Sequence, residues 1–141
     1  MAIPVFGDPM EFVVAAIQSA IPSAIVTSDP QRHNEFSKVD ADTEFILVQD
    51  QGGSTPSALY LTNVRCEVIS FTHRTYPIAP VIFAQRIQRI LYTAGYDQLV
   101  YANGHIFRPR TEVRPYVQAI SGLPVEVKRC SGTYTFGYRS R

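Results

Sequence analysis

Thr72, His73 and Arg74 are the first residues whose types and position could do chemistry, because they lie between a strand-like and a helix-like segment. Helix N-termini attract anions, so His73 and Arg74 could bind a negatively charged group. Cys66 lies on the same strand-like segment, which leaves a Cys-His nucleophile and base open. No second carboxylate and no glycine-rich cradle accompanies the triplet. The simpler interpretation is therefore a solvated corner.

The spacing of the other candidate ligands does not indicate a metal or cofactor. His33, His73 and His105 are far in sequence from one another and lack zinc-type spacing to either cysteine. The sequence contains neither standard phosphate-binding loop and no nucleophile elbow. We expect no cofactor, no metal and no catalytic residue. Cys66 and Cys130 are expected to be reduced, buried thiols of a protein made in a cytoplasm.

Arginines near the middle of the second half are the strongest candidates for binding. Arg108, Arg110 and Arg114 alternate along a segment expected to be extended, which places them on one face together with Glu112. Their guanidinium groups could bind phosphates or the carboxylates of another subunit. The alternative is a charged, proline-marked sheet edge that resists aggregation.

Length and composition are those of an ordinary globular domain. The 141 residues, 45% hydrophobic and 18% charged, predict one domain over residues 1–141 with a proper core. No segment is long and apolar enough to span a membrane, and the N-terminus lacks a secretion signal.

The net charge of +1 conceals an uneven distribution. Residues 1–70 carry nine acids and three bases, whereas residues 71–141 carry three acids and ten bases. This split could mark a nucleic-acid face, or it could bring the acidic side of one copy against the basic side of the next. A third possibility is that the two halves interleave in the fold and their fields cancel.

Two segments are predicted to be helices. Asp8 and Pro9 suit an N-cap and first helical position, Glu11 completes a capping box, and an apolar stripe continues to Ile21 before Pro22. The second helix is expected to begin near Pro77 or Pro80 and to end with Gly95 as its cap. Its apolar stripe contains Phe83, Ile87, Ile90, Leu91 and Ala94, while Arg86 and Arg89 lie off the stripe.

The remaining segments predict strands and loops. Strands are expected at residues 24–27, 44–49 and 59–72, around an Asn103-Gly104 hairpin, and at 125–129 and 133–139, joined near Ser131-Gly132. Residues 28–42 are expected to loop, and residues 50–57, with Asp50, Gly52 and Gly53, to form a flexible hairpin loop. This order predicts an α+β fold, a mostly antiparallel twisted sheet packed with two main helices.

The layout is carried by five kinds of segment. These are the capped helix DPMEFVVAAIQSAI, the strand AIVT, the strand-loop-strand unit EFILVQDQGGSTPSALYLTNV, the strand running into a helix VRCEVISFTHRTYPIAPVIFAQRIQRILYTAG, and the ending HIFRPRTEVRPYVQAI with TYTFGYR. Together they resemble the tail terminator proteins of long-tailed, siphovirus-type phages and related minor tail or neck proteins. The resemblance covers nearly all of the chain as a pattern without a fixed motif, and the basic, tyrosine-rich ending departs from it.

The resemblance implies a structural virion protein. Such proteins form a ring, typically a hexamer, that caps the finished tail tube, ends its elongation and presents a surface to the head-tail connector or stopper. The implied partners are other copies of the chain, the tail tube protein and that connector, while DNA passes through the lumen without specific binding and no membrane takes part. The location would be the head-proximal end of the tail, after synthesis in the host cytoplasm.

The residues expected to make subunit or tube contacts are Arg86, Arg89, Arg108, Arg110 and Arg114, with Asp50, Gly52 and Gly53 in a loop that orders on docking. Two other functions remain open from the residues alone. One is a small nucleic-acid-binding module that uses the basic second half. The other is a small enzyme acting through Cys66 or His73.

Overall fold

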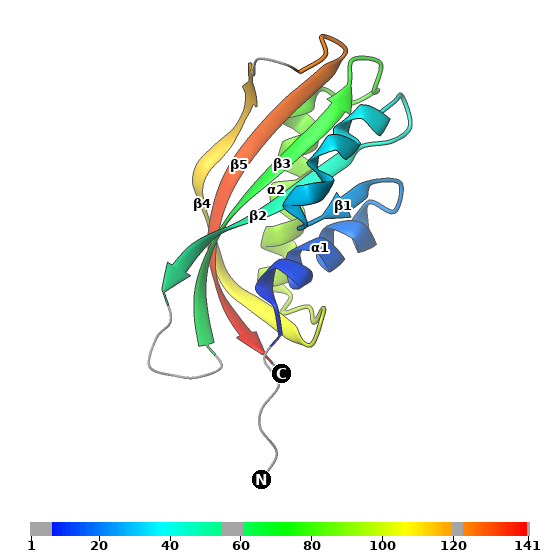
Figure 1. The fold of residues 1–141 in the computed structure, drawn as a ribbon. Helices are drawn as coiled ribbons and strands as arrows, with labels where there is room; N and C mark the ends of the chain where they lie inside the picture. Colours follow the sequence, from blue (N-terminus) through cyan, green and yellow to red (C-terminus); the bar gives the residue numbers. More distant parts are fainter. Residues whose placement is uncertain (1–6, 55–60, 120–122, 141) are drawn as a thin grey trace.

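A mixed β-sheet with helices on both faces forms the centre of the computed structural model, which describes residues 7–54, 61–119 and 123–140. Within these residues the sheet has five strands in the order β1-β2-β3-β5-β4 (Figure 1). Their bounds are β1 Ile25–Thr27, β2 Phe45–Ser54, β3 Leu61–His73, β4 Gly104–Gln118 and β5 Val127–Ser140. Only β1 and β2 pair in parallel among these strands. The predicted α+β fold with a mostly antiparallel sheet is confirmed.

The first helix, α1, covers Pro9–Ala20 as the start signal predicted. Asp8 is the N-cap, and its Oδ1 accepts a hydrogen bond from the Met10 amide at 2.9 Å. This bond satisfies one of the free N–H groups of the first turn. In the predicted capping box the Asp8 side chain would instead have accepted from the backbone amide of Glu11. The buried side chains of α1 are Met10, Phe12, Val13, Ala16 and Ile17.

The second helix, α2, covers Pro80–Tyr96 and begins at one of the two predicted prolines. The prediction that Gly95 caps it was wrong, because the helix continues to Tyr96 and Gln98 takes the left-handed conformation with φ of 50°. Gly95 is needed for packing instead, since a Cβ there would lie 2.7 Å from Cδ of Pro109 on β4. The glycine thus lets α2 approach the sheet.

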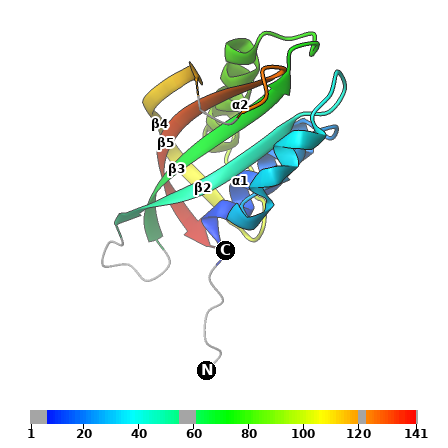
Figure 2. The ribbon, with the colours of Figure 1, turned by 45° about the horizontal axis from the view of Figure 1, so that its top comes forward.

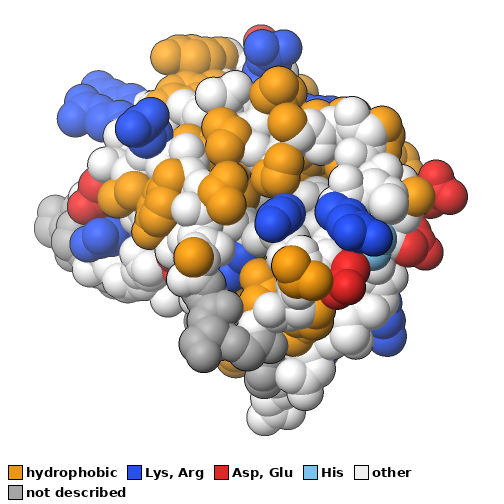
Figure 3. Space-filling view, turned by 90° about the horizontal axis from the view of Figure 1, so that it is seen from above, with side chains coloured by type: hydrophobic (Ala, Val, Ile, Leu, Met, Phe, Trp, Pro, Cys, Tyr) orange, Lys and Arg blue, Asp and Glu red, His pale blue; other side chains and the backbone are white. Residues whose placement is uncertain are grey.

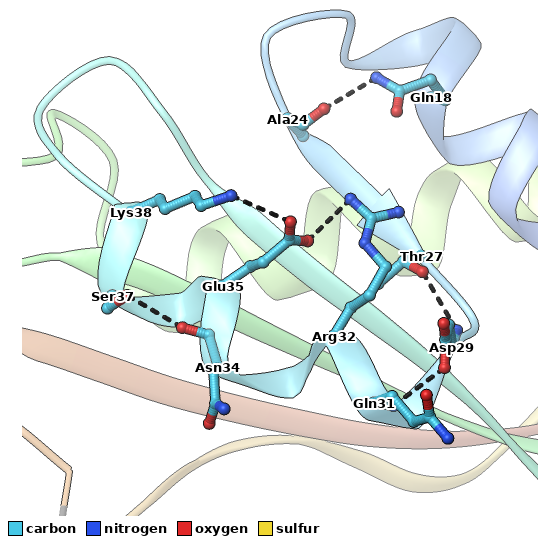
Figure 4. Close-up of polar contacts among 10 residues, drawn as sticks. All are labelled: Gln18, Ala24, Thr27, Asp29, Gln31, Arg32, Asn34, Glu35, Ser37 and Lys38. Carbon is cyan, nitrogen blue, oxygen red and sulfur yellow. Dashed lines mark hydrogen bonds and ion pairs between the residues drawn. The ribbon is translucent and has the colours of Figure 1, made fainter.

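A 3₁₀ helix, η1, occupies Pro30–Lys38, where a loop was predicted. Its start repeats the Asp-Pro signal of α1: Asp29 is the N-cap, and its Oδ1 accepts from the Gln31 amide at 2.9 Å (Figure 4). The loop prediction was wrong because it weighed the polar composition of this segment above its capping residues.

Glu35 stabilises η1 internally. Its carboxylate pairs with the Arg32 guanidinium at 2.7 Å and with Nζ of Lys38 at 3.1 Å (Figure 4). The hydrogen bond from Lys38, followed by those from Arg32, lowers the pKa of Glu35. Phe36 anchors η1 to the sheet by stacking on Phe71, with ring centroids 5.5 Å apart.

Strand β2 continues through residues 50–54, where a flexible loop was predicted. A bulge between Asp50 and Gly53 accommodates the glycines, with φ of 87° at Gly52 and 144° at Gly53, and the strand then pairs again with β3. The loop prediction was wrong for this part because glycine in a strand can mark a bulge. Residues 55–57 of the predicted loop and 59–60 of the predicted strand lie outside the described residues.

Strand β5 is one continuous strand, where two strands joined near Ser131-Gly132 were predicted. Ser131 and Gly132 pair in register with Ile69 and Val68 of β3, so the ladder continues through them. Gly132 is required there because a Cβ would lie 2.6 Å from the Tyr134 hydroxyl. The prediction of a break was therefore wrong.

The predicted Asn-Gly hairpin forms with its turn shifted by one residue. Its central residues are Ala102 and Asn103, both left-handed with φ of 50° and 60°, and Gly104 already begins β4. Two left-handed central residues define the type I′ turn, whose twist suits a hairpin. The preceding predicted strand is reduced to an isolated bridge at Tyr101.

Side chains alternate between the two faces of the sheet, and two core clusters result. Helices α1 and α2 cover one face over Ile46, Val48, Val64, Cys66 and Phe136. On the opposite face Phe36 of η1 packs with Phe45, Leu47, Ile69 and Phe71 (Figures 1 and 2). Because η1 lies over β2 and the adjacent part of β3, the face of β5 and β4 beyond it carries no described helix.

No helix in the described part of the chain combines the length and the apolar character needed to cross a membrane.

Candidate interaction site

A shallow hollow of about 480 Å³ lies on the uncovered part of the sheet face. Three arginines from two strands line it, together with two phenylalanines and two glycines, one of them in the β2 bulge. We name it the arginine hollow; its lining includes Arg65, Arg108, Arg110, Phe107, Thr135, Gly53 and Gly137. The hollow thus brings Gly53 of β2 beside Arg108 and Arg110 of β4, which were predicted as contact residues from two separate segments.

A bulge in β4 directs Arg108 and Arg110 into the same hollow. Phe107 pairs with Gly137 and Arg110 with Thr135, so β4 contains one more residue than β5 over this stretch. The extra residue is absorbed at Arg108, whose φ of 51° is left-handed. Such a conformation is unfavourable for a non-glycine residue, and strain of this kind often accompanies function.

Glycine backbone forms the floor and one wall of the hollow. The Phe107 ring lies directly on Gly137, where a Cβ would lie 2.2 Å from Cζ of the ring. At Gly53 a Cβ would lie 1.9 Å from the carbonyl oxygen of Asn63. These close approaches require glycine at both positions, so the shape of the hollow is set by backbone packing.

Only one of the three arginines is paired. Arg65 forms an ion pair with Glu112 at 3.2 Å between Nε and Oε2. Among the described residues no ion pair involves Arg108 or Arg110, and both side chains are exposed. The hollow therefore presents two guanidinium groups that can bind carboxylates or phosphates in a bidentate manner.

The prediction that Arg108, Arg110, Arg114 and Glu112 share one face holds for three of them, since Arg108 and Arg110 line the hollow and Glu112 pairs with Arg65 there. The simple alternation assumed for it was wrong. Register shifts interrupt β4 between Phe107 and Arg110, and again before and after Val113. The bulge at Arg108, and not the two-residue spacing in the sequence, brings Arg108 and Arg110 into the same hollow. Arg114 is exposed beyond the second bulge and does not line the hollow. The prolines do lie on an edge strand, as predicted.

The other predicted contact residues lie elsewhere. Asp50 accepts a hydrogen bond from the Gly52 amide at 2.7 Å at the bulge of β2. Arg86 and Arg89 line a separate groove between α1 and α2, on the helix side of the sheet. The five predicted arginines therefore do not form one patch.

The Cys-His pair considered from the sequence does not form. Cys66 is fully buried on the helix side of β3. His73 is seven residues further along the strand, and no register shift interrupts the pairing of β3 with β5, so His73 faces the opposite side of the sheet. Burial, and less strongly the charge of Asp50, raises the pKa of Cys66 to about 12, which disfavours the nucleophilic thiolate. His73 instead contacts Thr75, with Nδ1 2.7 Å from Oγ1.

The Thr-His-Arg triplet is a corner. His73 ends β3, Arg74 is exposed and its amide donates to the Glu126 carbonyl at 2.7 Å, and α2 begins only at Pro80. Neither residue therefore lies at the helix N-terminus, where an anion would bind. Within the described residues no group of three His, Cys, Asp or Glu side chains could hold a metal ion.

A second exposed surface lies at the end of the sheet where β4 ends and β5 begins. A concave region there is lined by Val117, Leu123, Pro124, Val125 and Val127. Val125 is 75% exposed and Val117 48% exposed, values that are unusual for valine in a core-forming segment. Figure 3 views this end and shows apolar side chains across it with Lys and Arg side chains among them. We call it the apolar end.

The strand order also separates the two charged halves of the sequence. Strands β1, β2 and β3, with η1 and α1, come almost entirely from residues 1–70, and β5 and β4, with α2, come from residues 71–141. Within the sheet the halves meet between β3 and β5 (Figure 1), and on the helix side they share one core, in which Phe12 of α1 packs against Tyr101 and Tyr138. Within the sheet the strands of the two halves do not interleave, whereas their helices and side chains pack together in one core.

Sequence reasoning missed the other lining residues of the hollow, among them Arg65, Phe107 and Gly137. Val64 and Cys66 are buried and Arg65 between them is exposed, so the alternation along this strand predicts the sheet face on which Arg65 lies. It does not predict which residues of the neighbouring strands lie beside Arg65. The pairing of Gly137 with Phe107 depends on the register of β4 with β5, which the bulges determine.

No known protein-family model matches this chain, and comparison with curated protein sequences gave no match.

Proposed function

We propose that this protein is a structural component of a phage tail that assembles into a ring at the tail end, as its resemblance to tail terminators implies. The observation that carries the proposal is the presence of exposed groups of opposite charge in different parts of the molecule. Strands β4 and β5 carry exposed Lys and Arg side chains, and the exposed carboxylates of the first half include Asp29, Asp40, Asp42 and Asp50, so copies can join with these groups facing one another.

Contacts of this kind are heterologous, because two different surfaces of each copy meet. Repeated heterologous contacts generate a closed ring when the rotation between copies closes, and the resemblance suggests six copies. The edge strands are consistent with this use. Strand β4 carries bulges, prolines and arginines that oppose simple strand-to-strand addition, so the contacts would be made by side chains.

A ring also needs a surface that meets the next ring of the tail. The apolar end fits this role, because exposed valines at one pole of the molecule would be buried by axial stacking on the tube or the connector. The groove with Arg86 and Arg89 is a further contact surface in this proposal, on the helix side of the same subunit.

A nucleic-acid-binding module remains the alternative, and the arginine hollow is the observation that favours it. Glu112 at the rim and Glu67 on the same face would repel a phosphate backbone there, which favours a protein partner. Retention of labelled single-stranded DNA on a filter at low and high salt separates the two functions. Tight binding that falls steeply with salt would support the alternative.

The direct test is assembly with tail tubes. Tube protein from the same viral genome is polymerised with and without this chain, and the products are imaged by negative-stain electron microscopy. We expect a ring at one end of each tube and tubes that stop growing when it is present. Tubes that elongate without change and bear no ring would contradict the proposal.

A further inference from the structure

The two guanidinium groups of Arg108 and Arg110 make the arginine hollow suitable for an acidic occupant. Arg108 and Arg110 have no ion-pair partner among the described residues, while Glu112 at the rim is already held by Arg65. The hollow is shallow, so it suits the tip of a turn better than a whole helix or strand. Its own lateral side has few acids, so a partner must supply the carboxylates.

The opposite side of the molecule has one suitable projection, a tight turn between η1 and β2 that we name the acidic turn, residues 40–43. The Asp42 amide donates to Oδ1 of Asp40 at 2.8 Å, and the Asp40 amide donates to the Thr43 carbonyl at 3.2 Å. These bonds fix the backbone and leave the small residue Ala41 at the tip. Asp40, Ala41 and Asp42 are all exposed, so two carboxylates project from a narrow turn.

The other acids of this half are mostly engaged within the chain. Asp8 and Asp29 cap helices, Glu35 is ion-paired, Glu44 is buried and Glu67 accepts from Ser131. Asp42 has no ion pair among the described residues, and Asp40 keeps its charge because the Asp42 amide and Thr43 lower its pKa, with a smaller effect from nearby His73. The acidic turn is therefore where exposed carboxylates are concentrated.

We infer that the arginine hollow of one copy receives the acidic turn of a second copy, and that Arg108 and Arg110 bind Asp40 and Asp42 across the subunit boundary. The inference rests on the proposed ring and names the residues that would join its subunits. In both pairs the two residues are two apart in the sequence, and hydrogen bonds of the turn and the strand fix their backbone. The hollow and the turn are on different parts of the surface, so the contact can repeat from copy to copy.

The test is a charge exchange measured by sedimentation velocity of the full chain over a range of protein concentrations. The hollow variant is Arg108→Glu with Arg110→Glu, and the turn variant is Asp40→Arg with Asp42→Arg. Each alone should weaken self-association on the order of tenfold at low salt, because attraction becomes repulsion. A chain that carries both exchanges should regain self-association, because its reversed turn then meets the reversed hollow of the next copy.

A matched control combines the turn exchange with reversal of Arg74 and Lys128, which are exposed, lie outside the hollow and carry the same charge. This chain should not regain self-association, so a general effect of net charge is distinguished from the specific contact. Circular dichroism and urea unfolding of each variant verify that it is folded.

Three results are decisive. Self-association of both single variants equal to that of the wild-type chain would overturn the inference while leaving a ring built on other contacts. Failure of the chain with both exchanges to regain self-association would also overturn it. A third outcome is that the charge exchange changes self-association as expected, but the products are only dimers or open chains that do not cap tubes. This outcome would support the contact and contradict the proposed function.

Discussion

At the scale of single residues, a buried carboxylate joins two connections of the fold. Glu44 is 2% exposed, and its carboxylate accepts from the Ser23 hydroxyl at 3.0 Å and from the Tyr76 hydroxyl. Ser23 lies between α1 and β1, and Tyr76 lies between β3 and α2. Burial, then the hydrogen bond to Glu44, raises the pKa of Tyr76 to about 12, so the phenol remains a donor at neutral pH.

Removing that donor should be costly. Tyr76→Phe keeps the ring packed at 5.5 Å from Phe83 and leaves the buried carboxylate with one donor fewer. We expect the free energy of unfolding in urea to fall by about 1.5–3 kcal/mol, as for hydrogen bonds to charged groups. Tyr96→Phe is the matched control, since Tyr96 is 75% exposed, and should change stability by less than about 0.5 kcal/mol. Equal effects of the two changes would refute this role of Tyr76.

The cysteines provide a second prediction at this scale. Burial raises the pKa of Cys66 to about 12 and that of Cys130 to about 11. Iodoacetamide at mildly alkaline pH should therefore leave the folded chain unmodified and label both thiols once urea unfolds it, as read by mass spectrometry. Above about pH 8.5 an unfolded thiol loses its proton, whereas the buried thiols of the folded chain keep theirs. The free energy of unfolding should therefore decline as the pH rises above about 8.5. Rapid labelling of the folded chain would show that one thiol is accessible.

At the scale of elements, the bulge at Arg108 can be tested by its strain. Arg108→Gly removes the unfavourable left-handed φ of 51° but adds backbone freedom to the unfolded chain, so stability should be unchanged or higher by up to about 1 kcal/mol. Arg110→Gly on the regular part of β4 has no strain to relieve and should lose about 0.5–1 kcal/mol. Urea unfolding compares the two, and equal losses would contradict the assigned strain.

The elements that sequence predicted well are those with strong local signals. Helices α1 and α2 begin at Pro9 and Pro80 and bury their apolar stripes, and the proline-marked strand β4 lies at the sheet edge. These features depend on hydrophobic period and on the missing N–H of proline, which act locally.

The elements that sequence missed depend on long-range pairing. The break predicted near Ser131-Gly132 is absent because β5 pairs with β3 through these residues. Residues 30–38, predicted as a loop, form η1, which is packed on the sheet by the stacking of Phe36 on Phe71. The candidate site was predicted in part, with Arg108, Arg110 and Gly53. Their convergence depends on bulges whose positions no local pattern encodes.

At the scale of the whole molecule, charge is unevenly divided between the two halves of the sequence. Residues 1–70 have a net charge of −6 and residues 71–141 a net charge of +7, while the total is only +1. A single copy is therefore close to neutral overall, although its two sequence halves carry opposite net charges. Association that brings exposed groups of opposite charge together should weaken as salt increases, because exposed charges are screened.

The central claim is that copies of this chain join through exposed groups of opposite charge and close into a ring, and native mass spectrometry of tube-capping complexes tests it most directly. Complexes are formed on tail tubes, released and weighed, because a template can be required for assembly. The account predicts one discrete ring mass, that of six copies, which dissociates at high salt and is lost with Arg108→Glu and Arg110→Glu. Monomers alone, with or without tubes and at every salt concentration, would contradict it.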